Sequence, residues 1–268
     1  MLSPVASSPE PTRAVTAADL ERVACWVEQA ERILFVTGAG LSADSGLPTY
    51  RGVGGLYDGV VTEEGLEIEE VLSGPMMRAR PELTWKYVHQ VEAACRGAQP
   101  NRGHEVIAAW QARRGTGVVL TQNVDGLHRI GTQPDLIEIH GNLYDLCCTQ
   151  CSWAGHVPDY AGLAPLPRCS GCGGLVRPRV VLFGEALPRR EVRRLEQEMR
   201  RGFDLVMMVG TSALFPYIAA PVSWADAWGA HTVEINPGTS AVSFLVDARL
   251  QAGAAATLDA LAARLGCG

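Results

Sequence analysis

The chain has 268 residues, of which 47% are hydrophobic and 19% are charged, and its formal net charge is −6. This composition is typical of a globular protein with a sizeable core and excludes a largely disordered chain. The acidic balance argues against bulk binding to nucleic acid or to an anionic membrane. Residues 1–15 lack the basic and apolar regions of a signal peptide and have the composition of a disordered tail, so we expect a cytoplasmic protein.

Strands and helices are predicted to alternate along the chain. Thr16 and Asp19 form a capping pattern that predicts a helix from residue 16 to about residue 30. The unbroken apolar run at 33–37 predicts a strand that is buried on both faces. Similar runs predict strands at 118–121, 136–139, 180–183, 205–209 and 232–235. Helical patterns lie at 101–114, 188–201, 217–229 and 256–265.

This alternation predicts an α/β fold: a doubly wound, Rossmann-like parallel sheet with helices on both faces. Ligands of such sheets bind at the carboxyl ends of the strands. Residues 143–179 interrupt the alternation, because they are rich in Cys, Pro and Gly. We therefore predict a tail at 1–15, a Rossmann-like domain formed by 16–142 and 180–268, and a small inserted module at 143–179.

Five of the eight cysteines lie between positions 147 and 172. Cys148-x₂-Cys151 and Cys169-x₂-Cys172 are separated by seventeen residues, and two such pairs can present four thiolates to Zn²⁺ in its preferred tetrahedral geometry. Four thiolates leave no open position for water, so we predict a zinc ribbon that holds one structural Zn²⁺ per chain. Cys147 could replace Cys148 as a ligand, but the matched spacing of the two pairs favours Cys148.

A glycine-rich loop directly follows the strand predicted at 33–37. Its sequence, Gly38-Ala-Gly40-Leu-Ser42-Ala43, has the form G-x-G-x-x-A, which allows the backbone to approach a pyrophosphate closely. Alone, this loop is weak evidence for a dinucleotide site. A dehydrogenase would also need an acidic residue about 20 positions further on, at the end of a second strand. Glu63 and Glu64 stand near that distance in a stretch unlike a strand end, so a redox Rossmann enzyme is not favoured.

Six further motifs follow the glycine loop in order. They are Leu-Pro-Thr-Tyr-Arg-Gly at 47–52, Thr-Gln-Asn-Val-Asp-Gly-Leu-His at 121–128, Ile-His-Gly at 139–141, Phe-Gly-Glu at 183–185, Gly-Thr-Ser at 210–212 and Asn-Pro at 236–237. With the cysteine module placed after His-Gly, this set closely resembles the sirtuin family of NAD-dependent protein lysine deacylases, in a bacterial-type member. The resemblance covers about residues 17–265. It implies an enzyme that consumes NAD as a co-substrate and releases nicotinamide, O-acyl-ADP-ribose and free lysine.

The resemblance also implies roles for individual residues. His140 matches the family's catalytic base, which deprotonates a ribose hydroxyl after nicotinamide has left, and Asn123 matches a second catalytic residue. Phe183, Gly184 and Glu185, with the stretch after Ser212, resemble strands that clamp an acylated-lysine protein as an extended strand. The residues implied in NAD binding are Gly38, Ala39, Gly40, Ser42, Asp44, Tyr50, Arg51, Tyr57, Gln122, Asn123, Val124, Asp125, Gly210, Thr211, Ser212, Asn236, Pro237 and Ala254.

One departure from the family concerns the acyl group. Members that remove succinyl or malonyl groups carry a Tyr-x-x-Arg pair, and alignment on Trp85 and Pro100 places that pair on Val88 and Val91. Two valines three residues apart in a predicted helix can face one pocket, and they offer no donor to a carboxylate. We therefore expect acetyl and short apolar acyl groups as substrates, with succinyl and malonyl much poorer.

Two other readings of the sequence remain open. A mono-ADP-ribosyltransferase would use the same NAD site, but members specialised for that reaction commonly lack the catalytic histidine that this chain keeps at His140. The second alternative is a non-catalytic module that senses a nucleotide or binds a partner through the zinc ribbon. The intact set of His140, Asn123 and Asp125 argues against such a module, and the lack of a basic patch argues against nucleic acid as a partner.

Overall fold

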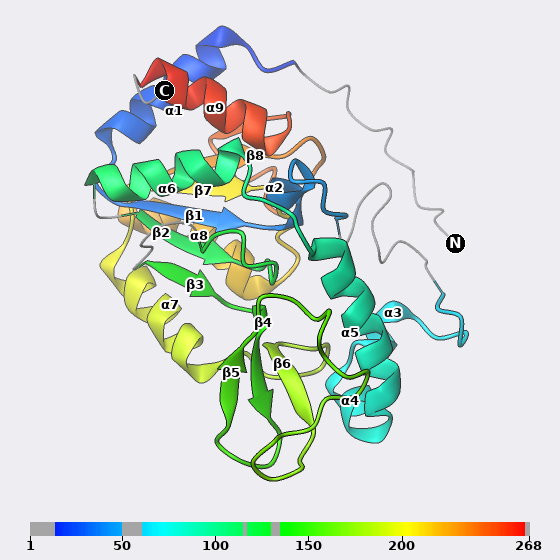
Figure 1. Cartoon of the computed structure of the whole chain (residues 1–268). Helices are drawn as coiled ribbons and strands as arrows, with labels where there is room; N and C mark the ends of the chain where they lie inside the picture. The colour runs from blue at the N-terminus through cyan, green and yellow to red at the C-terminus, as the bar shows by residue number, and fades with distance from the viewer. Residues whose placement is uncertain (1–13, 50–60, 115–116, 130–134, 266–268) are drawn as a thin grey trace, which may run out of the picture.

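A six-stranded parallel sheet forms the centre of the computed structural model, which describes residues 14–49, 61–114, 117–129 and 135–265 (Figure 1). The strand order is β3-β2-β1-β7-β8-β9, and every neighbouring pair is parallel. The chain therefore builds the sheet outward from β1, first to one side and then to the other, which confirms the doubly wound fold. The strands are β1 (Ile33–Thr37), β2 (Gly117–Thr121), β3 (Leu136–Glu138), β7 (Leu205–Val209), β8 (His231–Ile235) and β9 (Ala248–Leu250).

Helices cover both faces of this sheet. One face packs against α1 (Ala17–Gln29), α6 (Arg102–Arg114) and α9 (Ala254–Arg264), and the other packs against α7 (Arg189–Arg201) and α8 (Pro216–Trp228). Side chains of β1 alternate between the two cores, since Phe35 joins the first and Leu34 and Val36 join the second. All five residues of β1 are buried, which explains why its sequence is an unbroken apolar run.

A second, three-stranded antiparallel sheet carries the cysteine module. Its order is β5-β4-β6, formed by β4 (Gly141–Cys148), β5 (Ala154–His156) and β6 (Val176–Val180). Three helices, α3 (Ile68–Val71), α4 (Gly74–Ala79) and α5 (Pro81–Cys95), share a hydrophobic core with this sheet. The indole of Trp85 is fully buried in that core and donates a hydrogen bond to the Val176 carbonyl at 3.0 Å. The remaining helix, α2 (Ala39–Ala43), follows β1.

Most of the predicted elements are confirmed, but the run at 180–183 is not a strand of the parallel sheet. Val180 ends β6, which pairs antiparallel with β4. Beyond it, Phe183 forms an isolated bridge with Ser73, and the amide of Val181 donates to the His140 carbonyl at 2.9 Å. Of the residues at 180–183 only Leu182 is buried, and a short apolar run does not by itself distinguish a strand of the central sheet from other partly buried segments. At the N-terminus the capping box of Thr16 and Asp19 is present, as predicted.

The predicted division into a tail, a Rossmann-like domain and a module at 143–179 stays a prediction. The small sheet begins at Gly141 and ends at Val180, close to the predicted limits. Helices α3–α5 precede the module in sequence but pack against it, which the sequence analysis did not anticipate. The tail lies almost wholly outside the described residues. Within the described ranges, we find no helix that combines the length and the apolar character needed to cross a membrane.

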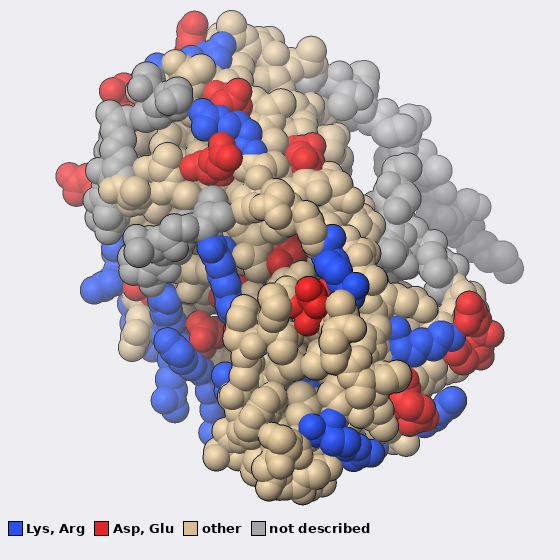
Figure 2. All heavy atoms as spheres, viewed as in Figure 1, with Lys and Arg blue, Asp and Glu red and all other residues tan. Residues whose placement is uncertain are grey.

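Charged side chains of both signs are interspersed over much of the face in Figure 2, but blue atoms gather at its lower left. Helix α7 lies at that position in Figure 1 and carries the sequence RREVRRLEQEMRR. Four of its arginines form ion pairs of 3.0–3.8 Å with acidic side chains: Arg190, Arg194, Arg200 and Arg201. This local basic stripe is therefore partly neutralised, and the sequence analysis did not anticipate it.

Candidate active site

The glycine loop lies against the segment that follows β7. The amide of Gly38 donates to the Val209 carbonyl at 3.1 Å, and that of Gly40 donates to the Gly210 carbonyl at 2.9 Å. A Cβ atom at Gly40 would lie only 2.7 Å from the Gly210 Cα, and one at Gly38 would lie 2.8 Å from the Gly210 oxygen. Gly210 itself has a φ of 59°. The two backbones approach so closely because both sides are glycine.

Polar side chains from the ends of four strands meet beside this loop, at the carboxyl edge of the sheet. We name this group the edge cluster; it comprises Ser42, Gln122, Asn123, Asp125, His140 and Thr211. Asn123 donates to the Gly38 carbonyl at 3.0 Å and to the Ser42 hydroxyl at 3.1 Å, and Ser42 donates to Asp125 at 2.7 Å. Because these three side chains are buried and mutually bonded, their positions are fixed before any ligand arrives.

Burial also affects the charge of Asp125. Removal from water raises the pKa of its carboxyl group, while hydrogen bonds from the Leu127 amide (2.9 Å) and the Ser42 hydroxyl oppose that shift. With the Leu127 amide and the Ser42 hydroxyl as its partners among the described residues, this buried carboxyl group keeps acceptor capacity for a ligand hydroxyl or amide.

Gln122 and Thr211 connect β2 to β7 across the edge. The Gln122 amide donates to the Thr211 hydroxyl at 2.8 Å, and Asn236 donates to the Thr211 carbonyl at 3.0 Å. On the other side of the loop, Asp44 accepts a hydrogen bond from the Ala255 amide at 2.9 Å, next to the buried Ala254. Asp44 thus caps the first turn of α9, a structural role beside its implied contact with the nucleotide.

His140 follows β3 and has a defined hydrogen-bond partner at each ring nitrogen. Its Nδ1 lies 3.1 Å from the Gln122 carbonyl oxygen, and its Nε2 lies 2.7 Å from the hydroxyl of Tyr217. A carbonyl can only accept, so Nδ1 carries the proton and Nε2 carries the lone pair of the neutral imidazole. Burial lowers the pKa of His140, which the contact with Gln122 partly offsets. The neutral, basic form therefore prevails at neutral pH.

A pocket opens beside the buried part of the edge cluster. Val91 of α5 lines it, whereas Val88, one turn earlier, is 2% exposed and belongs to the core shared with the small sheet. The structure thus brings one of the two predicted acyl-pocket valines to the opening and places the other behind it. The lining residues are Ala39, Ser42, Leu47, Pro48, Val91, Ala94, Cys95, Asn123 and Asp125. Burial raises the pKa of the Cys95 thiol to about 12, so it lines the pocket as an uncharged group.

The segment predicted to bind a peptide strand, 183–185, lies at the junction of the two sheets. Glu185 forms a two-pronged ion pair with Arg177, at 2.6 and 2.8 Å, and accepts the Leu182 amide at 3.0 Å. Burial raises the pKa of Glu185, but the Arg177 contact outweighs it and holds the pKa below its usual range. Glu185 therefore fixes the course of this segment. The amide of Phe183 donates to the Leu72 carbonyl at 3.0 Å, and its carbonyl accepts from the Gly74 amide at 2.9 Å.

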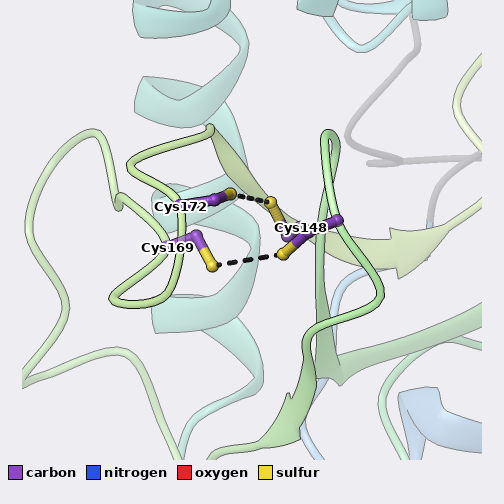
Figure 3. A group of neighbouring side chains, drawn as sticks. Cys148, Cys169 and Cys172 are labelled. Atoms are coloured by element: carbon purple, nitrogen blue, oxygen red, sulfur yellow. Dashed lines mark hydrogen bonds between the residues drawn. The ribbon is translucent and has the colours of Figure 1, made fainter.

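The four predicted zinc ligands converge beside the small sheet, and Figure 3 labels three of them: Cys148 at the end of β4, and Cys169 and Cys172 in the loop before β6. The Sγ atoms of Cys148, Cys151, Cys169 and Cys172 all lie within 4.8 Å of one another, and two pairs are 3.5 and 3.7 Å apart. Sulfurs about 2.3 Å from a tetrahedral zinc ion would be about 3.8 Å apart. The donor set and its spacing thus fit Zn²⁺, and Cys147 lies outside the group, which supports Cys148 as the ligand.

Three residues implied in NAD binding, Tyr50, Arg51 and Tyr57, lie outside the described residues. Two aromatic residues of the site were missed by the sequence analysis. Phe215 and Tyr217 both contact the His140 ring, with ring centroids 5.6 and 6.0 Å away. The signal available in the sequence was their position in the stretch after Ser212, which the resemblance assigned to peptide binding as a whole.

Three comparisons with known proteins all find members of one family. A model of the Sir2 family matches residues 38–215. A protein of Pseudomonas aeruginosa named NAD-dependent protein deacylase 2 is 51% identical over 85% of this chain and 90% of its own length, and a protein of the same name from Pseudomonas syringae is 50% identical over 85% and 93%. A solved complex of a Sir2 homologue with NAD superposes with a TM-score of 0.81, at 32% identity, over 92% of this chain and 95% of that one.

Proposed function

The chain belongs to the Sir2 family, and from that premise we propose that the edge cluster is the site at which this NAD-dependent protein deacylase removes an acyl group from lysine. The observation that carries the proposal is the convergence of His140, Asn123 and Asp125 beside the glycine loop, at the carboxyl edge of a doubly wound sheet. A mutant Sir2 homologue with 32% identity has been solved as a complex with 2′-O-acetyl ADP ribose, which supports O-acyl-ADP-ribose as the product.

Residues of the described loop and strand ends would hold NAD. Gly38, Ala39 and Gly40 would present the loop backbone to its phosphates, as the resemblance implies, while the side chains of Gln122 and Asp125 suit directional bonds to hydroxyl and carboxamide groups. Gly210, Thr211, Ser212, Asn236 and Pro237 would contact the adenosine part, as the resemblance implies. NAD supplies the ADP-ribose that accepts the acyl group.

His140 would act as the general base. Its Nε2 carries the lone pair and faces away from the Gln122 carbonyl, so this atom would take the proton of a ribose hydroxyl. Asn123 would orient the reacting groups, since its buried amide is already fixed by Gly38 and Ser42. The acylated lysine would enter between the segment at 183–185 and the segment after Ser212, with its peptide added as a strand.

The activity is tested by incubating the chain with an acetyl-lysine peptide, with and without NAD. We expect free lysine only when NAD is present, together with one nicotinamide for each lysine released. Protein that becomes labelled with ADP-ribose, without lysine release, would instead identify a mono-ADP-ribosyltransferase. Absence of turnover with bound NAD would identify a nucleotide-sensing module.

Replacing Gly40 by alanine is expected to strain the folded loop by about 1–3 kcal/mol. Because the loop must shift to relieve this strain, NAD binding should weaken by about tenfold. The new Cβ would meet the backbone of Gly210 at 2.7 Å, and backbone atoms cannot turn away as a side chain can. Calorimetric titration with NAD measures the change. Gly162→Ala is the matched control, since a Cβ there meets no atom within 4 Å. Equal NAD affinity of the Gly40 variant and the wild type would contradict a nucleotide site at this loop.

The acyl preference follows from the charge of the pocket. Val91 and Cys95 line it as uncharged groups, and the nearby guanidinium of Arg96 is engaged by the buried Glu92. Among the described lining residues a succinyl carboxylate would therefore meet no cation, and it would lie near the Asp125 carboxyl group, at a cost of several kcal/mol. On one peptide, we expect kcat/KM for succinyl-lysine to be lower than that for acetyl-lysine by about 100-fold or more.

The same peptide with propionyl or butyryl lysine is expected to react at rates comparable to the acetyl form, because each added methylene that is buried gains about 0.8 kcal/mol. Val91→Arg should raise succinyl turnover by supplying a cation in the pocket lining, whereas Val88→Tyr should not, because Val88 is buried in the core shared with the small sheet. Equal turnover of succinyl and acetyl lysine by the wild type would refute the role of the valines.

A further inference from the structure

Helix α7 carries an exposed row of arginines that the proposed reaction does not use (Figure 2). The helix contains six arginines and three glutamates, whereas the whole chain has a formal net charge of −6. Residues three and four positions apart share a side of a helix, so several of these arginines lie together. Four of them line one hollow with Gln197, and we name these four the arginine face: Arg189, Arg190, Arg193 and Arg194.

Half of the arginine face is available to a ligand. Arg194 is engaged in an ion pair at 3.0 Å, and Arg190, which is 90% exposed, lies 3.8 Å from the carboxylate of the neighbouring Glu191. Arg189 and Arg193 are exposed, and neither forms an ion pair with any residue that the structure describes. A guanidinium with free donors can bind a carboxylate through two parallel hydrogen bonds. Arg189 and Arg193 can therefore accept carboxylates without breaking an existing pair.

The first of these arginines stand where a helix favours them least. The helix begins at Arg189, so Arg189 and Arg190 lie in its first turn, at the positive end of the helix dipole. Pro188 precedes them and provides no side-chain cap. Cations are unfavourable at this end, and negative groups are favourable there. A sequence that breaks a local rule in this way is expected at a surface that serves binding rather than stability.

The start of α7 lies close to the segment proposed to bind the peptide. A helix that connects strands of a parallel sheet begins at the carboxyl edge and returns to the amino edge. Helix α7 does so, because Glu198 near its end pairs at 2.8 Å with Arg32, which directly precedes β1. Arg189 follows Glu185 by four positions, so their Cα atoms are at most about 14 Å apart. A bound strand advances about 3.3 Å per residue, so acidic residues about three to five positions from the acylated lysine can reach the arginine face.

Other described segments beside the proposed peptide path offer little free charge. Glu185 is engaged by Arg177, and the stretch at 213–217 contains no charged residue. Two other exposed arginines lie near the segment: Arg78 of α4, which acts electrostatically on Glu185, and Arg179 of β6. The arginine face is thus the one place near this path where several exposed cations of the described chain stand together.

We propose that the arginine face binds acidic residues that flank the acylated lysine, so that the enzyme selects substrate proteins with carboxylates near the target lysine. The inference rests on the proposed function. Charge complementarity carries it, because a chain of net charge −6 repels an acidic partner and a local cationic face opposes that repulsion where the substrate docks. Nucleic acid fits this surface less well, since α7 has no aromatic side chain on which a base could stack.

The test uses acetyl-lysine peptides that carry Glu, Gln or Lys about three to five positions from the acetylated residue, on one side or the other. At low ionic strength, we expect KM for the Glu peptide to be about three- to tenfold lower than that for the Gln peptide on one of the two sides, as two exposed charge pairs allow. The value of kcat should stay within about twofold. In about 0.5 M salt the difference in KM should fall below about twofold, because screening then acts within about 4 Å.

Variants of the arginine face identify the groups responsible. Arg189→Ala with Arg193→Ala should remove the preference for Glu, and Arg189→Glu with Arg193→Glu should reverse it in favour of the Lys peptide. Alanine and glutamate are good helix formers, so α7 should remain intact. Arg22→Ala with Arg264→Ala is the matched control, since it removes two exposed arginines from α1 and α9 on the opposite face of the sheet, and it should keep the wild-type preference. A wild type that does not favour the Glu peptide, or an alanine variant that still does, would overturn the proposal.

Peptide binding measured by fluorescence anisotropy separates this inference from the proposed function. The labelled Glu peptide should bind the wild type about three- to tenfold more tightly than the Gln peptide, and the alanine variant should bind both equally. If this holds in protein that lacks NAD-dependent deacylation, the arginine face is supported and the proposed function fails. Equal turnover of all the peptides would support the proposed function and overturn this inference. Single-stranded DNA that displaces the Glu peptide at lower concentration than the unlabelled peptide does would identify nucleic acid as the partner and also overturn it.

Discussion

Replacing His140 by alanine is expected to lower kcat for deacylation by about a thousandfold, within the range that a positioned general base contributes. The reason is chemical, because Nε2 of His140 is the basic atom of the edge cluster: burial lowers the pKa of the ring, and the bond from Nδ1 to Gln122 leaves the lone pair on Nε2. Steady-state assays with an acetyl-lysine peptide measure this loss. The affinity for NAD should change by no more than about threefold, since Gly40, Asn123 and Asp125 remain in place.

A control variant shows whether the loss of activity is specific to His140 or follows from removing any histidine. His156 is exposed on the small sheet and bonds Asp145 at 2.9 Å, so His156→Ala should keep full deacylase activity. If the His140 variant retained more than about a tenth of the wild-type rate, the base would have to be another group. If it lost NAD binding in parallel, His140 would belong to the cofactor contacts instead.

Loss of a zinc ligand is the second change expected to have a large effect. Cys151→Ser or Cys172→Ser should abolish the single bound zinc and lower the melting temperature by about 10 °C or more. Cys148 and Cys169 are buried in the hydrophobic core that the small sheet shares with α3, α4 and α5. Disruption of the metal centre should therefore loosen these helices as well as the module itself. Differential scanning calorimetry and metal analysis of the same samples measure both effects.

Cys147→Ser provides the control, since its sulfur lies outside the group of four. This variant should keep one zinc per chain and the wild-type melting temperature. A Cys151 variant that folds with unchanged stability and no metal would refute a structural zinc site. Loss of zinc from the Cys147 variant would show that the ligand at the end of β4 was assigned to the wrong neighbour.

The central sheet could be predicted from the sequence because its strands bury both faces. The run at 33–36 is apolar throughout, Thr37 follows it, and all five residues of β1 are buried. Strand β9 has only three residues and α3 only four. Segments this short contain too few residues to show a hydrophobic period in the sequence. The run at 180–183 has the composition of a buried strand, but pairing with β4 is a long-range choice that the local sequence does not encode.

The site could be predicted in part for a related reason. Parallel strands bring their carboxyl ends to one edge, so motifs that follow separate strands, such as those containing Ser42, Asn123 and His140, were expected to meet. They do so in the structure. The contact of Tyr217 with His140 was not predicted, because it depends on how α8 packs beneath the sheet. The place of Val88 behind Val91 depends in the same way on the rotation of α5.

The most direct test of the account follows the acyl group itself. A peptide whose lysine carries a ¹³C-labelled acetyl group is incubated with the chain and NAD, and the products are separated by mass spectrometry at early time points. The account predicts that the label moves to ADP-ribose, with one O-acetyl-ADP-ribose formed for each nicotinamide and each free lysine. Label that appears first in free acetate, with NAD unconsumed, would contradict it.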